Sequence, residues 1–321
     1  MKNRLGDILL FLIAIGLLSA LILHSNPAVI AKTLSGANLN LVVGAISITL
    51  AIIGVKIIRW NILLRSIGIK LTLKQVMQPY MASLFVSNIT PGRVGEPIRS
   101  YYLKKSTGHH ISKTLPTIVV ERIMDLSAVL LFSIFGLFYL SSVSNPVLII
   151  GIGMMILGLA AVIGVSMNRK IFHKVLEGFY IIFRFVPKIR KLTPKFEKIA
   201  DNFHSSFKLV AKSNEMPALF MITLICWFME FSIIKLSFFS IGFNVGFLTI
   251  FSVASLATII SLLTFLPGNI GSFEAASAIL MTQSGGMYLA TATSGILIYR
   301  FSSLIFALIV TSGSFLRYQR S

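Results

Sequence analysis

Charged side chains interrupt apolar sequence at residues 88–99, which read Asn-Ile-Thr-Pro-Gly-Arg-Val-Gly-Glu-Pro-Ile-Arg. The Thr-Pro-Gly triplet is expected to end a helix, and the following glycine lets the backbone turn. Residues 266–274, Leu-Pro-Gly-Asn-Ile-Gly-Ser-Phe-Glu, repeat the pattern Pro-Gly-x-x-Gly with a carboxylate close behind. The two stretches predict two broken helices, whose turns carry Asn88, Pro91, Gly92, Arg93, Gly95, Glu96 and Arg99 in the first copy and Pro267, Gly268, Gly271 and Glu274 in the second.

Further charges lie inside apolar segments: Glu121, Arg122 and Asp125 in 114–140, and Arg300 in 287–315. Charge at the bilayer centre costs about 2.5–3.5 kcal/mol per residue on insertion scales, so such side chains face the bundle interior and have partners. Glu121 and Asp125 share a helix face, and Arg122 can meet Asp125 one turn away. The set is either a polar path together with Glu96 or a static ion-pair network. Two carboxylates on one face favour the path.

Arginines are the predicted phosphate ligands, because a guanidinium donates to two phosphate oxygens at once. Arg93 and Arg99 fit this role, or they belong to ordinary cytoplasmic positive charge. Glu274 opens a helix, where the helix dipole favours a carboxylate, so it is either a functional group or a cap. Glu230 is either the buried partner of an arginine or a proton-titrating group. No catalytic set, metal site or ATP-binding loop is recognisable, so we expect neither an enzyme nor a cofactor.

The composition places these residues in a membrane protein. The chain has 321 residues, is 55% hydrophobic and 12% charged, and has a mean hydropathy of +0.88. Soluble proteins carry about 25% charged residues. Apolar segments of about 18–25 residues predict an all-α membrane helix bundle rather than a barrel. The net charge of +19 is attributed to cytoplasmic loops that face anionic lipid headgroups, and not to nucleic-acid binding.

Six segments are expected to cross the membrane, at about 7–24, 39–58, 114–140, 147–167, 217–241 and 287–315. The positive-inside rule puts both termini and loop 59–74 in the cytoplasm and loop 25–38 outside, with Trp60 as an interfacial anchor. A full crossing by residues 75–90 would put the basic cluster that follows them outside, so 75–113 is predicted to be a re-entrant hairpin from the cytoplasm. Because both termini are expected in the cytoplasm, the number of full crossings must be even. Residues 246–285 are therefore predicted to form a second hairpin, which enters from outside.

The two halves, 1–140 and 217–321, are predicted to form an inverted repeat within one membrane domain, 1–321. Pro91 precedes Arg122 by 31 residues, and Pro267 precedes Arg300 by 33. Gly/Pro-interrupted segments at matching places in two halves indicate the central site of a transporter. The intervening segment, 168–215, is basic with two apolar stripes at helical spacing. It fits amphipathic helices at the inner membrane surface or the cytoplasmic ends of long membrane helices.

Three motifs carry a family resemblance: Asn88-x-Thr-Pro-Gly-Arg-x-Gly-Glu96, Glu121-Arg122-x-x-Asp125-Leu126 and Pro267-Gly-x-x-Gly-x-x-Glu274. They resemble the flippase-like membrane domain of lysylphosphatidylglycerol synthases, which also occurs alone in archaea and bacteria. The likeness covers nearly the whole chain, although Asn269 stands where a glycine is often found. The resemblance implies lipid translocation. Because the sequence ends at Ser321, we expect the aminoacyl-transferase activity of those synthases to be absent.

The sequence thus predicts a flippase or scramblase that moves a phospholipid or a polyprenyl-phosphate-linked lipid between leaflets of the cell membrane. Its expected partners are membrane lipids with anionic headgroups. The alternative is a membrane subunit that scaffolds a separate lipid-modifying or glycosyl-transferring enzyme.

Overall fold

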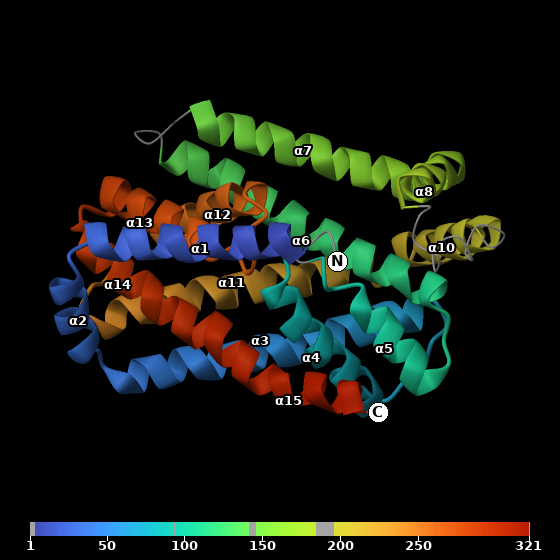
Figure 1. Cartoon of the computed structure of the whole chain (residues 1–321), viewed down its shortest axis with the longest axis horizontal. Coiled ribbons are helices and arrows are strands. Elements are labelled where there is room, and N and C mark those ends of the chain that lie inside the picture. The colour runs from blue at the N-terminus through green and yellow to red at the C-terminus, as the bar shows by residue number, and fades with distance from the viewer. Residues whose placement is uncertain (1–3, 93, 141–145, 184–195, 321) are drawn as a thin grey trace.

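The computed structural model describes residues 4–92, 94–140, 146–183 and 196–320. These residues form helices and no β-strand, which confirms the predicted all-α class. The helices, shown in Figure 1, are α1 (Arg4–His24), α2 (Pro27–Ser35), α3 (Leu39–Ser66), α4 (Leu73–Ile89), α5 (Ile98–Thr107), α6 (Ile111–Tyr139), α7 (Pro146–Met167), α8 (Arg169–Phe183), α10 (Phe196–Ala211), α11 (Met216–Ser240), α12 (Phe247–Leu263), α13 (Ser272–Gly285), α14 (Leu289–Arg300), the π-helical segment η3 (Phe301–Ile305) and α15 (Phe306–Arg320).

Helix length and hydropathy select four helices in the described residues that can cross a membrane, in the ranges 39–66, 148–167, 216–240 and 289–318. A fifth is the pair α1 and α2, which is bent by 87°. Of the six expected spans, α6 is not selected. It is 29 residues long but carries the cluster of Glu121, Arg122 and Asp125, and these charges lower its hydropathy. The expected span that this selection leaves out is therefore one that carries charge inside the bundle.

Two helical hairpins enter the bundle from opposite ends (Figure 1). The first consists of α4 and α5, and the second of α12 and α13, with each turn at a Pro-Gly pair. In α4 the N-terminus is fixed by a capping box in which Thr72 and Gln75 satisfy each other's backbone groups,. The turns lie near the middle of the molecule, where they meet.

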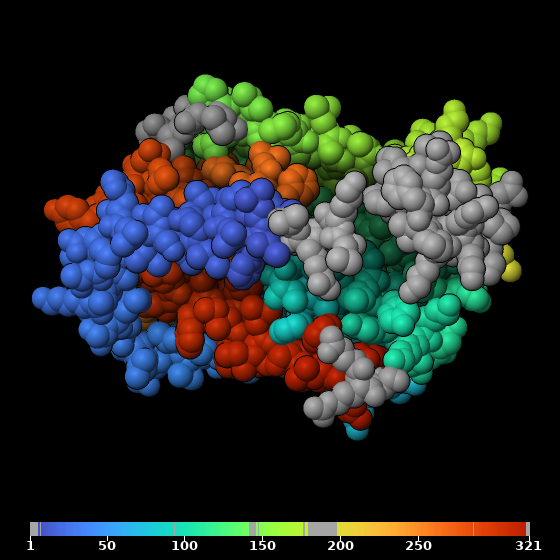
Figure 2. Space-filling view, viewed as in Figure 1, coloured from blue at the N-terminus to red at the C-terminus, as the bar shows by residue number. Residues whose placement is uncertain are grey.

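Two hydrophobic clusters hold the bundle together. One gathers α3, α6, α11, α12, α13 and α14 around the edge-to-face rings of Phe132, Phe231 and Phe251,. The other gathers α3, α4, α5, α6 and α10 around Trp60, and its α10 residues include Phe203. The apolar stripe of α10 therefore packs on protein. Figure 2 shows α1 and α2, in blue, lying across one face beside the red C-terminal helices.

The structure corrects the expected loop at 25–38. Nine of its residues form α2, which begins at Pro27 after the N-cap Asn26 and turns sharply from α1. Proline is favoured in the first turn of a helix, where its missing N–H is not needed. The hydroxyls of Ser25 and Thr293 are 2.9 Å apart, and the N–H of Asn38 donates to the Ser240 carbonyl at 2.8 Å. These contacts tie α2 to the ends of α11 and α14.

Candidate functional site

The two hairpin turns touch each other through their backbones. Pro91 and Pro267 form an isolated antiparallel bridge, so turns that are 176 residues apart in sequence meet tip to tip. Both following glycines adopt positive φ angles, +57° at Gly92 and +58° at Gly268. A Cβ at Gly268 would lie 2.8 Å from the Asn88 carbonyl oxygen, which is too close for any side chain,. Glycine therefore allows the tips to approach.

The remaining turn glycines also sit at close approaches. A Cβ on Gly271 (φ +81°) would lie 2.6 Å from the carbonyl oxygen of Ala14, so the second hairpin is seated directly on α1. A Cβ on Gly95 would lie 2.7 Å from Val86 in the first hairpin. Asn269, which stands where the family resemblance leads us to expect glycine, has a φ of +56°. Asparagine tolerates this left-handed conformation better than most residues, so the substitution preserves the turn.

Each hairpin turn is joined by an ion pair to the long helix that follows it. Glu96 accepts hydrogen bonds from both Nε and Nη2 of Arg122. Glu274 accepts from Nε of Arg300 at 2.6 Å, and the same guanidinium donates to the carbonyls of Gly268 and Asn269. In both halves the carboxylate precedes its arginine by 26 residues. This shared spacing supports the inverted repeat independently of the Pro-Gly motif.

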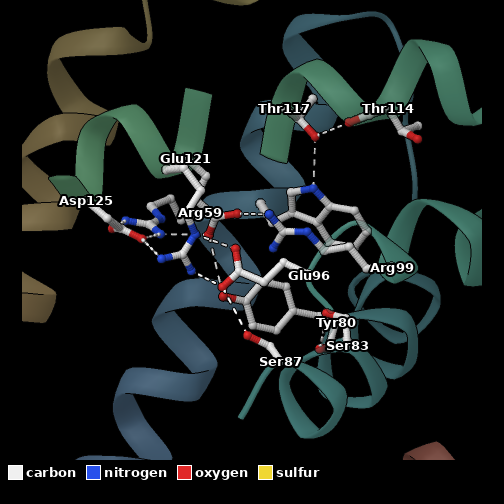
Figure 3. Close-up of polar contacts among 12 residues, drawn as sticks. Arg59, Tyr80, Ser83, Ser87, Glu96, Arg99, Thr114, Thr117, Glu121 and Asp125 are labelled. Carbon is white, nitrogen blue, oxygen red and sulfur yellow. Dashed lines mark hydrogen bonds and ion pairs between the residues drawn. The ribbon is translucent and has the colours of Figure 1, made fainter. Parts of the chain in front are cut away.

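A second ion-pair network, drawn in Figure 3, has no counterpart in the other half among the described residues. Arg59 on α3 donates to Glu121 and to Asp125, each at 2.7 Å, and to Thr223 on α11 at 2.8 Å. Glu121 also pairs with Arg99 on α5. The Arg59 side chain is only 1% exposed, and those of Glu121 and Arg99 are 3% exposed. Four helices therefore converge on one dry cluster of charges.

Trp60 is buried beside this network, so its expected role as an interfacial anchor is wrong. Its indole N–H donates to Thr117 Oγ1 at 3.0 Å, and its side chain has no exposed area. The Arg99 guanidinium lies 4.8 Å from the indole centroid and 5.1 Å from that of Tyr80. Two aromatic faces thus hold the arginine in place, and both interactions are attractive.

A polar cavity of about 120 Å³ lies beside the hairpin tips. Its charged lining residues are Lys56, Arg122, Asp125, Glu230 and Arg300, and its other lining residues are Cys226, Trp227, Thr258, Asn269, Phe273 and Tyr299. The cavity is smaller than the 300–1,000 Å³ typical of sites for drug-sized ligands. It therefore has room for a small polar group only. Among the described residues, no group of His, Cys, Asp and Glu side chains could hold a metal ion.

Comparison with known proteins identifies the family of this chain. The model of the lysylphosphatidylglycerol synthase TM region matches residues 8–311. This protein belongs to that family. The match covers both hairpins and all the charged residues of the site, in agreement with the resemblance carried by the three motifs.

Members of the family from archaea are similar over most of their length. A "UPF0104 membrane protein" of Methanothermobacter thermautotrophicus is 24% identical over 296 residues, which cover 89% of this chain and 87% of the relative. One from Pyrococcus horikoshii is 23% identical and covers 71% of this chain and 72% of the relative. Another, from Methanocaldococcus jannaschii, is 31% identical over 57% of this chain and 72% of the relative. The family and the apolar helices together make this a multi-pass membrane protein.

Most site residues named from the sequence converge in this family member. The charged residues named in the first turn, α6, the second turn and α14 form ion pairs, and the two turns that carry some of them touch at Pro91 and Pro267. Arg93 lies outside the described residues. Glu230 accepts a hydrogen bond from the Tyr299 hydroxyl at 2.7 Å rather than an ion pair from an arginine. Asn88 lines a neighbouring cavity of about 90 Å³.

Two residues of the site, Lys56 and Arg59, are not among those predicted from the sequence, where Lys56 falls near the end of the expected span 39–58 and Arg59 at the start of the expected loop 59–74. The helix instead continues to Ser66. One signal could have identified them. Lys56 and Arg59 are three residues apart and share a helix face, and the paired carboxylates of α6 need cationic partners.

Proposed function

We propose that this protein is a lipid translocase of the cell membrane, with both termini cytoplasmic, which moves a phosphate-bearing lipid between leaflets. The observation that carries the proposal is the antiparallel contact between Pro91 and Pro267 beside a charged cavity. Irregular backbone at membrane depth is tolerated only where protein or a water-filled cavity surrounds it. Broken helices that meet at the middle of two halves are the arrangement of secondary transporters.

The charged groups suit passage of a headgroup. A polar headgroup that crosses hydrocarbon unaided loses its hydration, whereas the ion-paired and hydrogen-bonded lining of the cavity replaces water. The central cavity and a smaller cavity lined by Glu96 share Arg122 as a lining residue. A rearrangement of the Glu96–Arg122 pair would join them. We therefore assign the Glu96–Arg122 pair as the group that opens and closes the path.

The test is transbilayer movement of a fluorescent phosphatidylglycerol in proteoliposomes made from the purified chain alone. Movement is read as the fraction of label that dithionite, added outside, can reduce. Glu96→Gln and Arg122→Gln each remove a charge-assisted bidentate contact, so we expect about a tenfold or greater loss of rate. Glu215→Gln and Arg317→Gln change exposed residues away from the cavity and should leave the rate unchanged.

Unchanged rates in the Glu96 and Arg122 variants would overturn the assignment of the pair. No movement by the wild-type chain across lipids with phosphodiester and polyprenyl-phosphate headgroups would overturn translocation itself. Co-purification of a lipid-modifying enzyme together with that result would instead support the scaffold alternative.

A further inference from the structure

The arginines that line the interior are already occupied by carboxylates. Arg99 pairs with Glu121, and Arg59 pairs with Glu121 and Asp125. Arg122 pairs with Glu96, and Arg300 pairs with Glu274. A phosphate that bound to any of these guanidinium groups would have to displace a hydrogen-bonded carboxylate. These arginines are therefore less available to bind an incoming anion than a cation without an ion-pair partner would be.

Lys56 differs from these arginines. Its side chain forms no ion pair with any carboxylate that the structure describes. It lies within α3, is half-buried, and lines the central cavity as well as two adjoining cavities. A lysine inside a membrane span that faces a cavity marks a substrate or ion pathway. Lys56 stands at the junction of all three spaces.

Two carboxylates, Asp125 and Glu230, line the central cavity together with Lys56, and neither forms an ion pair with it in the described residues. Asp125 lines the same cavity but is held at 2.7 Å by Arg59. Glu230, also in the lining, accepts the hydroxyl of Tyr299. The lining of the central cavity thus presents three cations and two carboxylates. The carboxylate partners of Arg122 and Arg300, which are Glu96 and Glu274, lie outside that lining. Because Arg122 and Arg300 are paired with these carboxylates, Lys56 is the cation of this lining that no ion pair in the described residues offsets.

We propose that Lys56 is the phosphate ligand of the cavity and binds the phosphate of a lipid headgroup, with the acyl chains remaining outside. This inference rests on the proposed function and names the group that recognises the substrate. An ammonium on a flexible four-carbon stem acts as a point charge with rotatable donors. Because Lys56 borders three cavities, its ammonium can follow the phosphate from one to the next. A rigid arginine fork locked to a carboxylate cannot do this.

The first experiment measures equilibrium binding of dioctanoyl phosphatidylglycerol to the full chain in a neutral detergent. Loss of a charge-assisted contact in Lys56→Gln should weaken binding about tenfold or more, and Lys56→Arg should retain most of the affinity. Lys74→Gln removes the same charge from an exposed residue of α4 and should bind as wild type does. Equal binding by wild type and Lys56→Gln would overturn the proposal. The binding readout is independent of transport, so a failure of translocation is seen separately.

Two further arms test a charge-balancing role for Lys56 and the identity of the bound anion. If Lys56 only balances Glu230, adding Glu230→Gln to Lys56→Gln should restore affinity, and restoration would refute the phosphate role. Glycerol phosphate and inorganic phosphate serve as soluble competitors. Binding of inorganic phosphate without binding of the lipid would overturn the headgroup assignment.

In the wild-type chain, dioctanoyl phosphatidylglycerol should protect Lys56 from an amine-reactive reagent, and mass spectrometry reads the extent of modification. Absence of protection also counts against the proposal.

Discussion

Glu121 is the residue on which the buried network depends, because it accepts from two guanidinium groups while almost no part of it reaches solvent. The interior network contains three arginines and three carboxylates, so its formal charges balance: Arg59, Arg99 and Arg122 against Glu96, Glu121 and Asp125. Such networks add little stability over an apolar core, yet breaking one is costly. Loss of a single member leaves an uncompensated charge that is buried.

We predict that Glu121→Gln destabilises the protein by about 3–5 kcal/mol, because Arg59 and Arg99 both lose a charged acceptor in a dry site. The measurement is the melting temperature in a mild detergent. The control is Asp201→Asn, which breaks an ion pair with Arg169 whose two side chains are both more than half exposed. A surface pair contributes only about 0–1 kcal/mol. Equal melting of the two variants would show that the Glu121 network does not stabilise the bundle.

Single residues could be assigned from the sequence only where their charge conflicted with their surroundings. Glu121, Arg122 and Asp125 stood out because apolar residues flank them on both sides. Arg59 and Trp60 did not, since a basic residue and a tryptophan at the end of an apolar run are also typical of a membrane interface. Their burial depends on long-range packing, with Trp60 on Thr117 and Arg59 on Glu121.

At the scale of elements, the two hairpin turns depend on backbone contacts more than on side chains. Gly92 approaches Phe265 of the opposite hairpin, and Gly268 approaches the carbonyl of Asn88. Both turns therefore combine a left-handed conformation with a close contact, and each demands glycine for two separate reasons. The two hairpins form one unit through these tips.

Gly268→Ala is predicted to destabilise the protein and to lower lipid movement, because the new Cβ would meet the Asn88 carbonyl at 2.8 Å at a φ of +58°. Gly158→Ala is the matched control. This glycine lies exposed in α7, with nothing within 4 Å of a Cβ. Alanine is favoured over glycine in a helix by about 1 kcal/mol, so the control should melt at the same temperature or higher. A Gly268→Ala variant with wild-type melting and transport would argue against a closed tip contact.

Helices and turns were predictable from the sequence where a long apolar segment or a Pro-Gly pair identifies them. The expected helix at 217–241 is observed as α11, Met216–Ser240, and the turns lie at the two Pro-Gly sites. The short helix α2 was not predicted, because the hydrophobic periodicity of nine residues is too short to distinguish a helix from a loop. The sequence also could not show that the turns touch, since that depends on how the two halves pack.

At the scale of the whole molecule, the two ends of the bundle differ in charge. Contacts of Ser25 with Thr293 and of Asn38 with Ser240 join the α1–α3 connection to α11 and α14 at one end. Figure 1 shows α5, α8 and α10 at the other end. Basic residues lie in or next to the ends of α4, α5, α6 and α10: Lys70, Lys74, Lys104, Lys105, Lys113 and Lys212. The positive-inside rule therefore predicts that this basic end faces the cytoplasm.

This orientation predicts the accessibility of single cysteines introduced into a Cys226→Ser background, from which the one native cysteine has been removed. Ser35→Cys and Tyr288→Cys lie at exposed positions of the less basic end, so an impermeant maleimide should label both in intact cells. Lys70→Cys and Lys212→Cys, exposed at the basic end, should react only after permeabilisation. Labelling of Ser35→Cys and Lys70→Cys from the same side would mean that α3 does not cross the membrane. Labelling of Tyr288→Cys from the inside alone would place the second hairpin on the cytoplasmic side, and the opposed entry of the two hairpins would then be wrong.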